Sequence, residues 1–426
     1  MPEKTSVSII TMGCPKNMVD SERLAGKLVH NGFAVDHEKE EADVIIINTC
    51  GFINDAKSES INEILAFSEL KKEGRISKLI VSGCLSQRYR DELRKEMPEV
   101  DEFFGVSEYD VLLTYLKKPI KSAKDRMLIT PSHYAYLKIA EGCDRSCSFC
   151  AIPGIRGGLK SVPVEDLIAE TEMLAEKGVK ELILIAQDTV SYGIDLYGQS
   201  KTAELIRRIS KVEGIDWIRL MYTYPAGFSD ELIDEIATNP KLVKYIDIPL
   251  QHINDEILKS MRRGHNRTKT VELIKKIRTR IPEVCIRTAF IVGYPGETKA
   301  EFNELYAFAK EMKFERVGVF AYSREENTPA WDLGDPVAPR TKMKRMSDLI
   351  ALHEKNSTKH NQSLIGKECS VICDGKEGGE FVGRLMCDAP EIDNIAFIKG
   401  ENLQRGKIYK TKITGAGIYD VEAEVL

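Results

Sequence analysis

The chain has 426 residues, of which 42% are hydrophobic and 30% charged, and its formal net charge is −5. This composition excludes a largely disordered chain, and the lack of any apolar run near 18 residues predicts no membrane-spanning helix. The length predicts about three domains, and the negative charge argues against holding nucleic acid by overall electrostatics, although a local basic patch remains possible.

The N-terminal end has no charged region followed by an apolar one, so we expect a cytoplasmic protein. Ten cysteines in a cytoplasmic chain favour metal binding over disulfides.

Strands and helices alternate in the predicted N-terminal domain, residues 1–122. Hydrophobic runs predict buried parallel strands at Ser6–Met12, Asp43–Thr49 and Lys78–Ser82. Apolar residues at three- and four-residue spacing predict helices at Val19–Asn31, Asp55–Lys72 and Gln87–Lys95. This alternation indicates a parallel α/β fold, with ligands outside the carboxyl ends of the strands.

A cysteine with a neighbouring glycine follows each of these strands: Cys14 beside Gly13, Cys50 beside Gly51, and Cys84 beside Gly83. A single one would be interpreted as a small buried hydrophobe. Parallel strands bring all three to one sheet edge, and glycine lets the backbone approach a bulky cofactor. The three thiols are therefore candidate ligands of an iron-sulfur cluster, with one iron left open.

A second set of thiols, Cys143, Cys147 and Cys150, follows a charged linker, Lys117–Arg126, and an apolar strand. The spacing C-x3-C-x2-C suits three irons of a cubic 4Fe-4S cluster and leaves the fourth without a protein ligand. Structural zinc would need a fourth ligand, and none follows at a usual spacing. Packing cysteines usually lie in apolar runs, whereas these lie among Asp, Arg and Ser residues.

This spacing, with Phe149 just before the last cysteine, resembles that of the radical S-adenosylmethionine (SAM) enzymes. The resemblance implies that SAM chelates the open iron and that one electron, from a reductant, cleaves it to methionine and a 5′-deoxyadenosyl radical. The segments Met12–Glu22, Asn48–Ile53 and Ser82–Cys84 resemble the N-terminal domain of the methylthiotransferases. These enzymes insert a methylthio group at an unactivated C–H bond.

Six further strands alternate with helices over residues 129–345. The predicted strands are Tyr134–Ala140, Glu181–Ala186, Trp217–Tyr222, Tyr245–Pro249, Cys285–Val292 and Arg316–Tyr322. The predicted helices are Val164–Lys177, Lys201–Val212, Ser229–Thr238, Thr268–Arg280 and Ala300–Lys313. We expect a partial (β/α)6 barrel of parallel strands, with its site at their carboxyl ends.

The expected SAM-binding residues lie near the cysteine loop or within and after these strands: Phe149, Gln187, Arg287, Gly293 and Gly296. The two glycines suit close approach of the backbone to SAM, and Arg287 suits a carboxylate. An ion pair inside the barrel is the alternative for Arg287. His252 is as compatible with a structural as with a functional role, and Cys285 is expected in the core.

Four segments resemble the RimO type of methylthiotransferase: Gly13–Asn17, Ala186–Gly193, Asp247–His252 and Met261–Arg263. This type modifies the β-carbon of an aspartate in a small-subunit ribosomal protein, protein twelve, at the decoding centre. The implied mechanism uses two 4Fe-4S clusters. The one at Cys143, Cys147 and Cys150 generates the radical, and the auxiliary one at Cys14, Cys50 and Cys84 supplies sulfur that a second SAM methylates.

Two alternatives remain from the sequence. The tRNA-modifying MiaB type, which acts on adenosine, usually has Gln-Met-Asn after its first cysteine and Gln-Asn in place of Gln187-Asp188. A non-enzymatic iron-sulfur electron carrier would explain six cysteines, but not the glycine-containing loop Gly293–Glu297 or the open ligand positions.

A connecting helix at residues 346–361, for which the helical pattern covers Met343–His360, leads to a small β-barrel at residues 362–426 that resembles the TRAM domain. Its predicted strands are Glu368–Cys373, Phe381–Met386, Ile395–Ile398, Lys407–Ile413 and Tyr419–Val425. Eight basic and eleven acidic residues give it a net charge of −3. An acidic barrel favours contact with a basic ribosomal protein over RNA, the alternative being a solvated surface. Cys369, Cys373 and Cys387 are expected to be packing residues.

Overall fold

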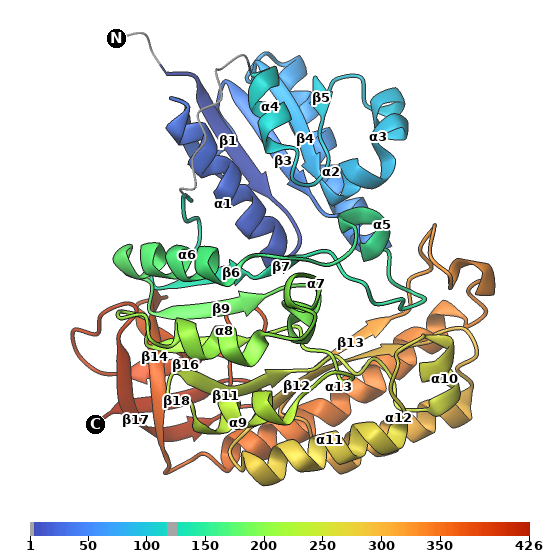
Figure 1. The fold of residues 1–426 in the computed structure, drawn as a ribbon, viewed down its shortest axis with the longest axis vertical. Helices are drawn as coiled ribbons and strands as arrows, with labels where there is room; N and C mark the ends of the chain where they lie inside the picture. Colours follow the sequence, from blue (N-terminus) through green and yellow to red (C-terminus); the bar gives the residue numbers. More distant parts are fainter. Residues whose placement is uncertain (1–3, 117–125) are drawn as a thin grey trace.

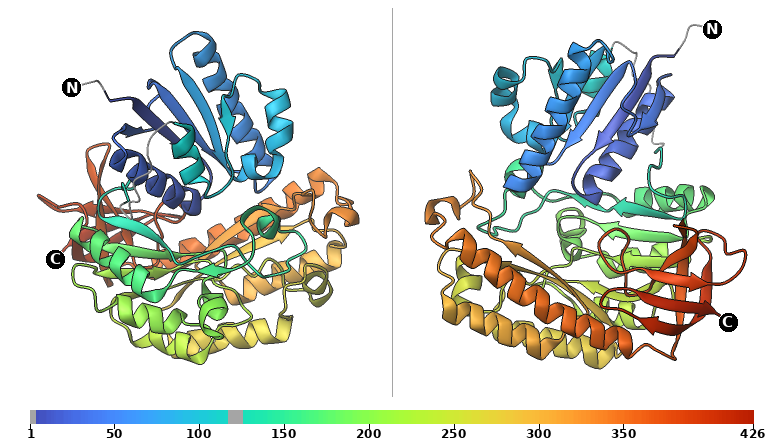
Figure 2. Two further views of the ribbon diagram at one scale, coloured as in Figure 1. Left: turned by 45° about the horizontal axis from the view of Figure 1, so that its top comes forward. Right: turned by 180° about the vertical axis from the view of Figure 1, so that it is seen from behind.

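Three large β-sheets organise the computed structural model, which describes residues 4–116 and 126–426 (Figure 1). The N-terminal sheet stands over the central one, and the C-terminal barrel packs beside the central sheet (Figures 1 and 2). The predicted charged linker lies outside the described residues except for Arg126, which is buried and paired with Glu22. In the described part of the chain no helix is long and apolar enough to cross a membrane.

The N-terminal sheet is parallel, with the order β2-β1-β3-β4-β5. Its strands are β1 (Ser6–Thr11), β2 (Ala34–His37), β3 (Val44–Thr49), β4 (Lys78–Gly83) and β5 (Glu102–Phe103). Its helices are α1 (Pro15–His30), α2 (Asn54–Lys72), α3 (Cys84–Glu96) and α4 (Tyr109–Tyr115). Because Asn48 pairs with both Thr11 and Ser82, the three strands that precede cysteines end at one level.

The central sheet is also parallel and open, with the order β13-β12-β11-β10-β9-β6. Its strands are β6 (Tyr134–Lys138), β9 (Glu181–Ile185), β10 (Trp217–Leu220), β11 (Leu242–Asp247), β12 (Cys285–Val292) and β13 (Arg316–Ala321). Its main helices are α6 (Val164–Glu176), α8 (Thr202–Ile209), α9 (Asp230–Thr238), α11 (Arg267–Arg280) and α12 (Lys299–Met312). Helices α8, α9, α11 and α12 cover the face turned away from the N-terminal domain (Figure 1).

The C-terminal domain is a closed five-stranded barrel, with the order β14-β15-β16-β18-β17. Helix α13 (Pro339–Gln362) leads to it from the central sheet. The strands are β14 (Glu368–Glu377), β15 (Glu380–Leu385), β16 (Ala396–Lys399), β17 (Ile408–Ala416) and β18 (Val421–Val425). The three predicted architectures, two parallel α/β units and one small β-barrel, are confirmed.

Buried ion pairs fasten the C-terminal barrel to the central sheet. Glu181 of β9 lies between Arg219 of β10, at 2.8 Å, and Arg384 of β15, at 2.6 Å. Arg316 pairs with Asp388 at 2.5 Å.

Several acidic residues of the barrel are therefore neutralised by ion pairs within the protein. Without the paired Asp374, Asp388, Asp393 and Arg384, seven basic and eight acidic residues remain, a net charge of −1. The charge argument for a basic partner therefore weakens.

Replacing Glu181 with Gln is expected to lower the free energy of unfolding by about 3 kcal/mol, because it leaves buried Arg219 without its anion and Arg384 with Asp374 alone. Burial opposes ionisation of Glu181, but Arg384 and Arg219 hold the pKa of its carboxyl below the usual value. The stability that this depressed pKa contributes is complete above the unfolded-state pKa and is lost as the pH falls through the folded-state pKa.

Urea unfolding between pH 3 and pH 7 tests the Glu181 prediction, and E181Q should show a flatter loss of stability in acid. The matched control is Glu422→Gln, whose carboxylate pairs with Lys399 on the surface, and it should change the free energy by less than about 1 kcal/mol. Equal effects of the two substitutions would contradict a role for burial.

Candidate active site

The first three cysteines lie where β1, β3 and β4 end. Cys14 precedes α1, Cys50 follows β3, and Cys84 is the first residue of α3. A Cβ added to Gly13 would lie 2.6 Å from Cβ of Cys50, and one added to Gly51 would lie 2.7 Å from the backbone of Leu85. The turns therefore interlock at one sheet edge, and this closeness requires glycine.

Asn17 of α1 holds this edge together. Its Nδ2 donates to the carbonyl oxygens of Met12, at 2.9 Å, and Thr49, at 3.0 Å, while its own carbonyl accepts from Asn48. The turns that carry Cys14 and Cys50 are thereby tied to the same helix.

The second thiol set lies in the loop after β6 and β7 (Ala140–Glu141). The backbone N–H of Arg145 donates to Sγ of Cys143 at 3.4 Å, and the guanidinium of Arg263 donates to Sγ of Cys147 at 3.3 Å. Both guanidinium groups also stack on the ring of Tyr224, at 4.1 and 4.2 Å. The sulfur atoms of this loop therefore accept hydrogen bonds from one cation, Arg263, and from one backbone N–H.

The chemistry of both thiol sets fits iron-sulfur clusters. Burial raises the pKa of Cys143 to about 11 and that of Cys84 to about 12, so these thiols stay protonated at neutral pH until a metal displaces the proton. Among the described residues, no three His, Cys, Asp or Glu side chains converge as a single metal ion would require. A cubic cluster differs, because each thiolate binds a separate iron.

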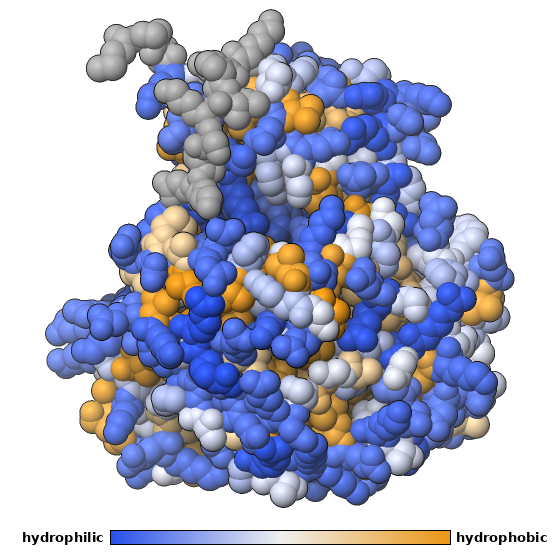
Figure 3. Space-filling view, viewed as in Figure 1, coloured by the Kyte–Doolittle hydropathy of each residue, from blue (hydrophilic) through white to orange (hydrophobic). Residues whose placement is uncertain are grey.

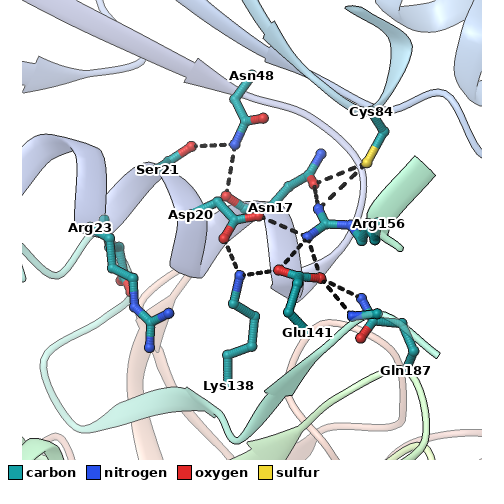
Figure 4. Close-up of polar contacts among 12 residues, drawn as sticks. Asn17, Asp20, Ser21, Arg23, Asn48, Cys84, Lys138, Glu141, Arg156 and Gln187 are labelled. Carbon is teal, nitrogen blue, oxygen red and sulfur yellow. Dashed lines mark hydrogen bonds and ion pairs between the residues drawn. The ribbon is translucent and has the colours of Figure 1, made fainter. Parts of the chain in front are cut away.

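A buried polar network extends from Cys84 of the N-terminal set to Glu141, two residues before the second set (Figure 4). At its centre is Arg156, the last residue of α5 (Ile152–Arg156). Its guanidinium lies 3.0 Å from Asp20 and 2.9 Å from Glu141, and it donates to Oδ1 of Asn17 at 2.6 Å and to Sγ of Cys84 at 3.4 Å. One side chain of the central domain thus contacts a thiol of the N-terminal set.

Lys138 and Gln187 complete this network from the central sheet. Lys138 pairs with Asp20 and, at 2.6 Å, with Glu141, to which Nε2 of Gln187 also donates at 2.8 Å. Although burial opposes ionisation, Lys138 and Arg156 lower the pKa of Glu141 to about 2. The network is therefore a charged, fixed connection between the N-terminal and central domains. On the surface, a hydrophilic hollow lies between these two domains (Figure 3).

Lys16 and Tyr222 meet at the same junction. Nζ of Lys16 lies 3.0 Å from the centroid of the Tyr222 ring, and burial lowers the pKa of Lys16 to about 8. Tyr222 follows β10 with φ of 57° and donates its N–H to Asp247 at 2.9 Å.

The structure places the expected SAM-binding residues in different settings. Phe149 packs beside Tyr294 and Tyr322, and Gln187 belongs to the network. Gly293 and Gly296 have φ of 74° and 94°, and a Cβ on Gly293 would meet Lys342 at 2.4 Å. Arg287 pairs with Asp247 at 3.1 Å and Asp393 at 3.3 Å, which supports the ion-pair alternative for this residue.

Two other expectations concern single residues. His252 is fully buried, and its Nδ1 accepts from Asn254, which fits a structural role. Cys285 is 2% exposed in the core, as expected.

Arg156 was not identified from the sequence, and Arg263 was named only as the end of a segment, Met261–Arg263, that resembles the RimO type. The signal for Arg156 was an arginine six residues after Cys150, and nothing local showed which anions it would meet.

Three family models match successive parts of the chain. Residues 6–105 match a family described as uncharacterized protein family UPF0004, residues 137–309 match the radical SAM superfamily, and residues 365–426 match the TRAM domain. The cysteine sets fall in the first and second of these matches.

Full-length relatives carry one common name. A protein of Christiangramia forsetii named ribosomal protein uS12 methylthiotransferase RimO is 48% identical over 100% of this chain and 95% of its own. One of the same name from Thermoanaerobacter is 45% identical over 98% and 99%. Among solved structures, the radical SAM methyltransferase TsrM from Kitasatospora setae aligns with a TM-score of 0.57 over 79% of this chain and 80% of that one, at 13% identity. This likeness concerns the fold alone.

Proposed function

The chain belongs to the RimO family of ribosomal protein uS12 methylthiotransferases and contains their radical SAM domain, and from this we propose that it methylthiolates the β-carbon of an aspartate in uS12. The aspartate would be the one that uS12 places at the decoding centre. Such a substrate implies that the enzyme works in the cytoplasm.

The observation that carries this proposal is the buried polar network that runs from Cys84, in the N-terminal set, to Glu141, two residues before the second set. We assign one 4Fe-4S cluster to Cys143, Cys147 and Cys150, and the auxiliary one to Cys14, Cys50 and Cys84. The Arg156 network, which contacts Cys84 and begins beside the other cysteine loop, supports a single reaction centre that uses both. With SAM and an external reductant, the clusters would supply the radical and the sulfur.

The protein residues have supporting roles in this assignment. Arg263 and the N–H of Arg145 would stabilise the negative charge on the sulfur atoms of the first set. We assign SAM binding to Phe149, Gln187, Gly293 and Gly296, because Phe149 lies in this loop and the other three follow the carboxyl ends of strands in the same sheet. Arg287 would position Asp247 and the Asp393 segment instead.

The tRNA alternative has less support. It predicts a basic C-terminal barrel, and the exposed charge of this barrel remains slightly negative. We propose that the barrel contributes to contact with uS12, through shape and individual polar groups more than through net charge.

The proposed substrate is tested with anaerobically reconstituted enzyme, SAM, a strong reductant and either uS12 or bulk tRNA. Mass spectrometry should show a methylthio increment on one aspartate of uS12, and no modified adenosine in tRNA. Protein uS12 with that aspartate replaced by alanine is the matched control and should stay unmodified. An increment on tRNA alone would refute the assignment to uS12.

A further inference from the structure

The ammonium of Lys16 is buried at the domain junction with no hydrogen bond or ion pair to any residue that the structure describes. Lys16 follows Cys14 by two positions at the start of α1 and is 8% exposed. Nζ of Lys16 lies over the ring of Tyr222, 3.0 Å from its centroid. Burying a cation without an anion is costly, so the site calls for an anionic ligand.

The nearby carboxylates of the protein are already engaged. Asp247 accepts from Arg287 at 3.1 Å and from the N–H of Tyr222 at 2.9 Å. Glu141 is held by Lys138, Arg156 and Gln187. Cys14, Asp247 and Glu141 act on the ammonium of Lys16 through the electric field, but none of them is bonded to it, so its hydrogen-bonding capacity is left for a ligand.

The partner of Lys16 across the junction is held in an unusual backbone conformation. Tyr222 has φ of 57°, in the left-handed region that non-glycine residues rarely adopt, and Asp247 fixes its N–H. Such conformations persist where surrounding contacts impose them and occur often at ligand sites. The end of β10 therefore presents the ring to α1, and the ring directs the ammonium without neutralising it.

We propose that Lys16 binds the carboxylate of the substrate residue and so selects an aspartate for modification. This inference rests on the proposed function, because it takes the substrate to be a protein carboxylate. The β-carbon of aspartate is bonded directly to the carboxyl carbon. An ammonium on the carboxylate would therefore hold the reacting carbon close to Cys14, on the sulfur-donating side of the junction.

The test compares uS12 with its aspartate and uS12 with asparagine at that position, for the wild-type enzyme and Lys16→Met. The wild-type enzyme should prefer aspartate, and K16M should reduce kcat/KM for aspartate about 100-fold, the typical loss for a buried charge-assisted contact. The decisive result is the aspartate-to-asparagine ratio, which should fall close to one in K16M. A purely structural lysine would lower both rates and leave this ratio unchanged.

The matched control is Lys27→Met, on the same helix, where the ammonium pairs with Asp110 at 2.7 Å. It should keep the wild-type ratio. Iron content is measured first, and K16Q replaces K16M if the latter loses iron.

Three results would overturn the inference: an unchanged ratio, loss of iron from both Lys16 variants, or a raised KM for SAM with an unchanged ratio. The last would mean that Lys16 holds the carboxylate of SAM. If the wild-type enzyme fails to modify uS12 at all, the proposed function fails and this inference falls with it.

Discussion

Cys147→Ala is expected to abolish SAM cleavage, whereas Cys50→Ala should abolish methylthiolation while 5′-deoxyadenosine still forms. Each substitution removes a ligand from one thiol set, and the sets lie in separate domains. The wild-type protein should bind about eight irons, and each variant about four. Iron and sulfide determination, together with chromatography of 5′-deoxyadenosine, measures these outcomes.

Cys369→Ala is the matched control for the cysteine variants. Cys369 is half-buried in β14, away from both sets, and should leave iron content and product unchanged. Loss of both activities in C50A at full iron content would contradict the assignment of radical formation to one cluster and sulfur supply to the other. A wild-type protein with about four irons would contradict the two-cluster assignment.

Replacing Arg156 with Met is expected to lower the free energy of unfolding by about 3–5 kcal/mol, because it leaves Asp20 and Glu141 buried with less positive charge. The same change removes the donor to Sγ of Cys84 and the bond to Asn17, which orders the cysteine turns. We therefore also expect loss of iron from the N-terminal set. Urea unfolding and iron content of the reconstituted variant test both effects.

The control for R156M is Arg75→Met, an exposed arginine of the N-terminal domain that pairs with Glu41. It should cost less than about 1 kcal/mol, since surface ion pairs contribute little. Normal iron content in R156M would show that the network stabilises the junction without organising the cluster site.

Much of the fold was predictable because its signals are local. The hydrophobic runs that predicted strands at Asp43–Thr49 and Cys285–Val292 correspond to β3 and β12 within one residue. Among the missed elements, β2, β5 and α4 are two to seven residues long and lack a complete hydrophobic period. Short elements of this kind are stabilised by their neighbours more than by their own sequence.

The surface charge of the C-terminal barrel, in contrast, could not be predicted from the sequence. Counting residues suggested an acidic surface, but Asp388 is 2% exposed and bound to Arg316 of the central sheet. Composition counts charges without their location, so a surface property could not be obtained from it.

The sequence by itself determined the two thiol sets, the parallel strands that deliver them and the family resemblance, because spacing and periodicity are encoded within short stretches of chain. Only the tertiary structure decided how the two domains that carry these sets are connected. Arg156 meets Asp20 across 136 positions of sequence and Lys138 meets Asp20 across 118. The ammonium of Lys16, buried at the same junction, makes no ion pair with any residue that the structure describes. Which buried charges are paired depends on how α1 docks against the central sheet, and no local sequence pattern predicts that contact.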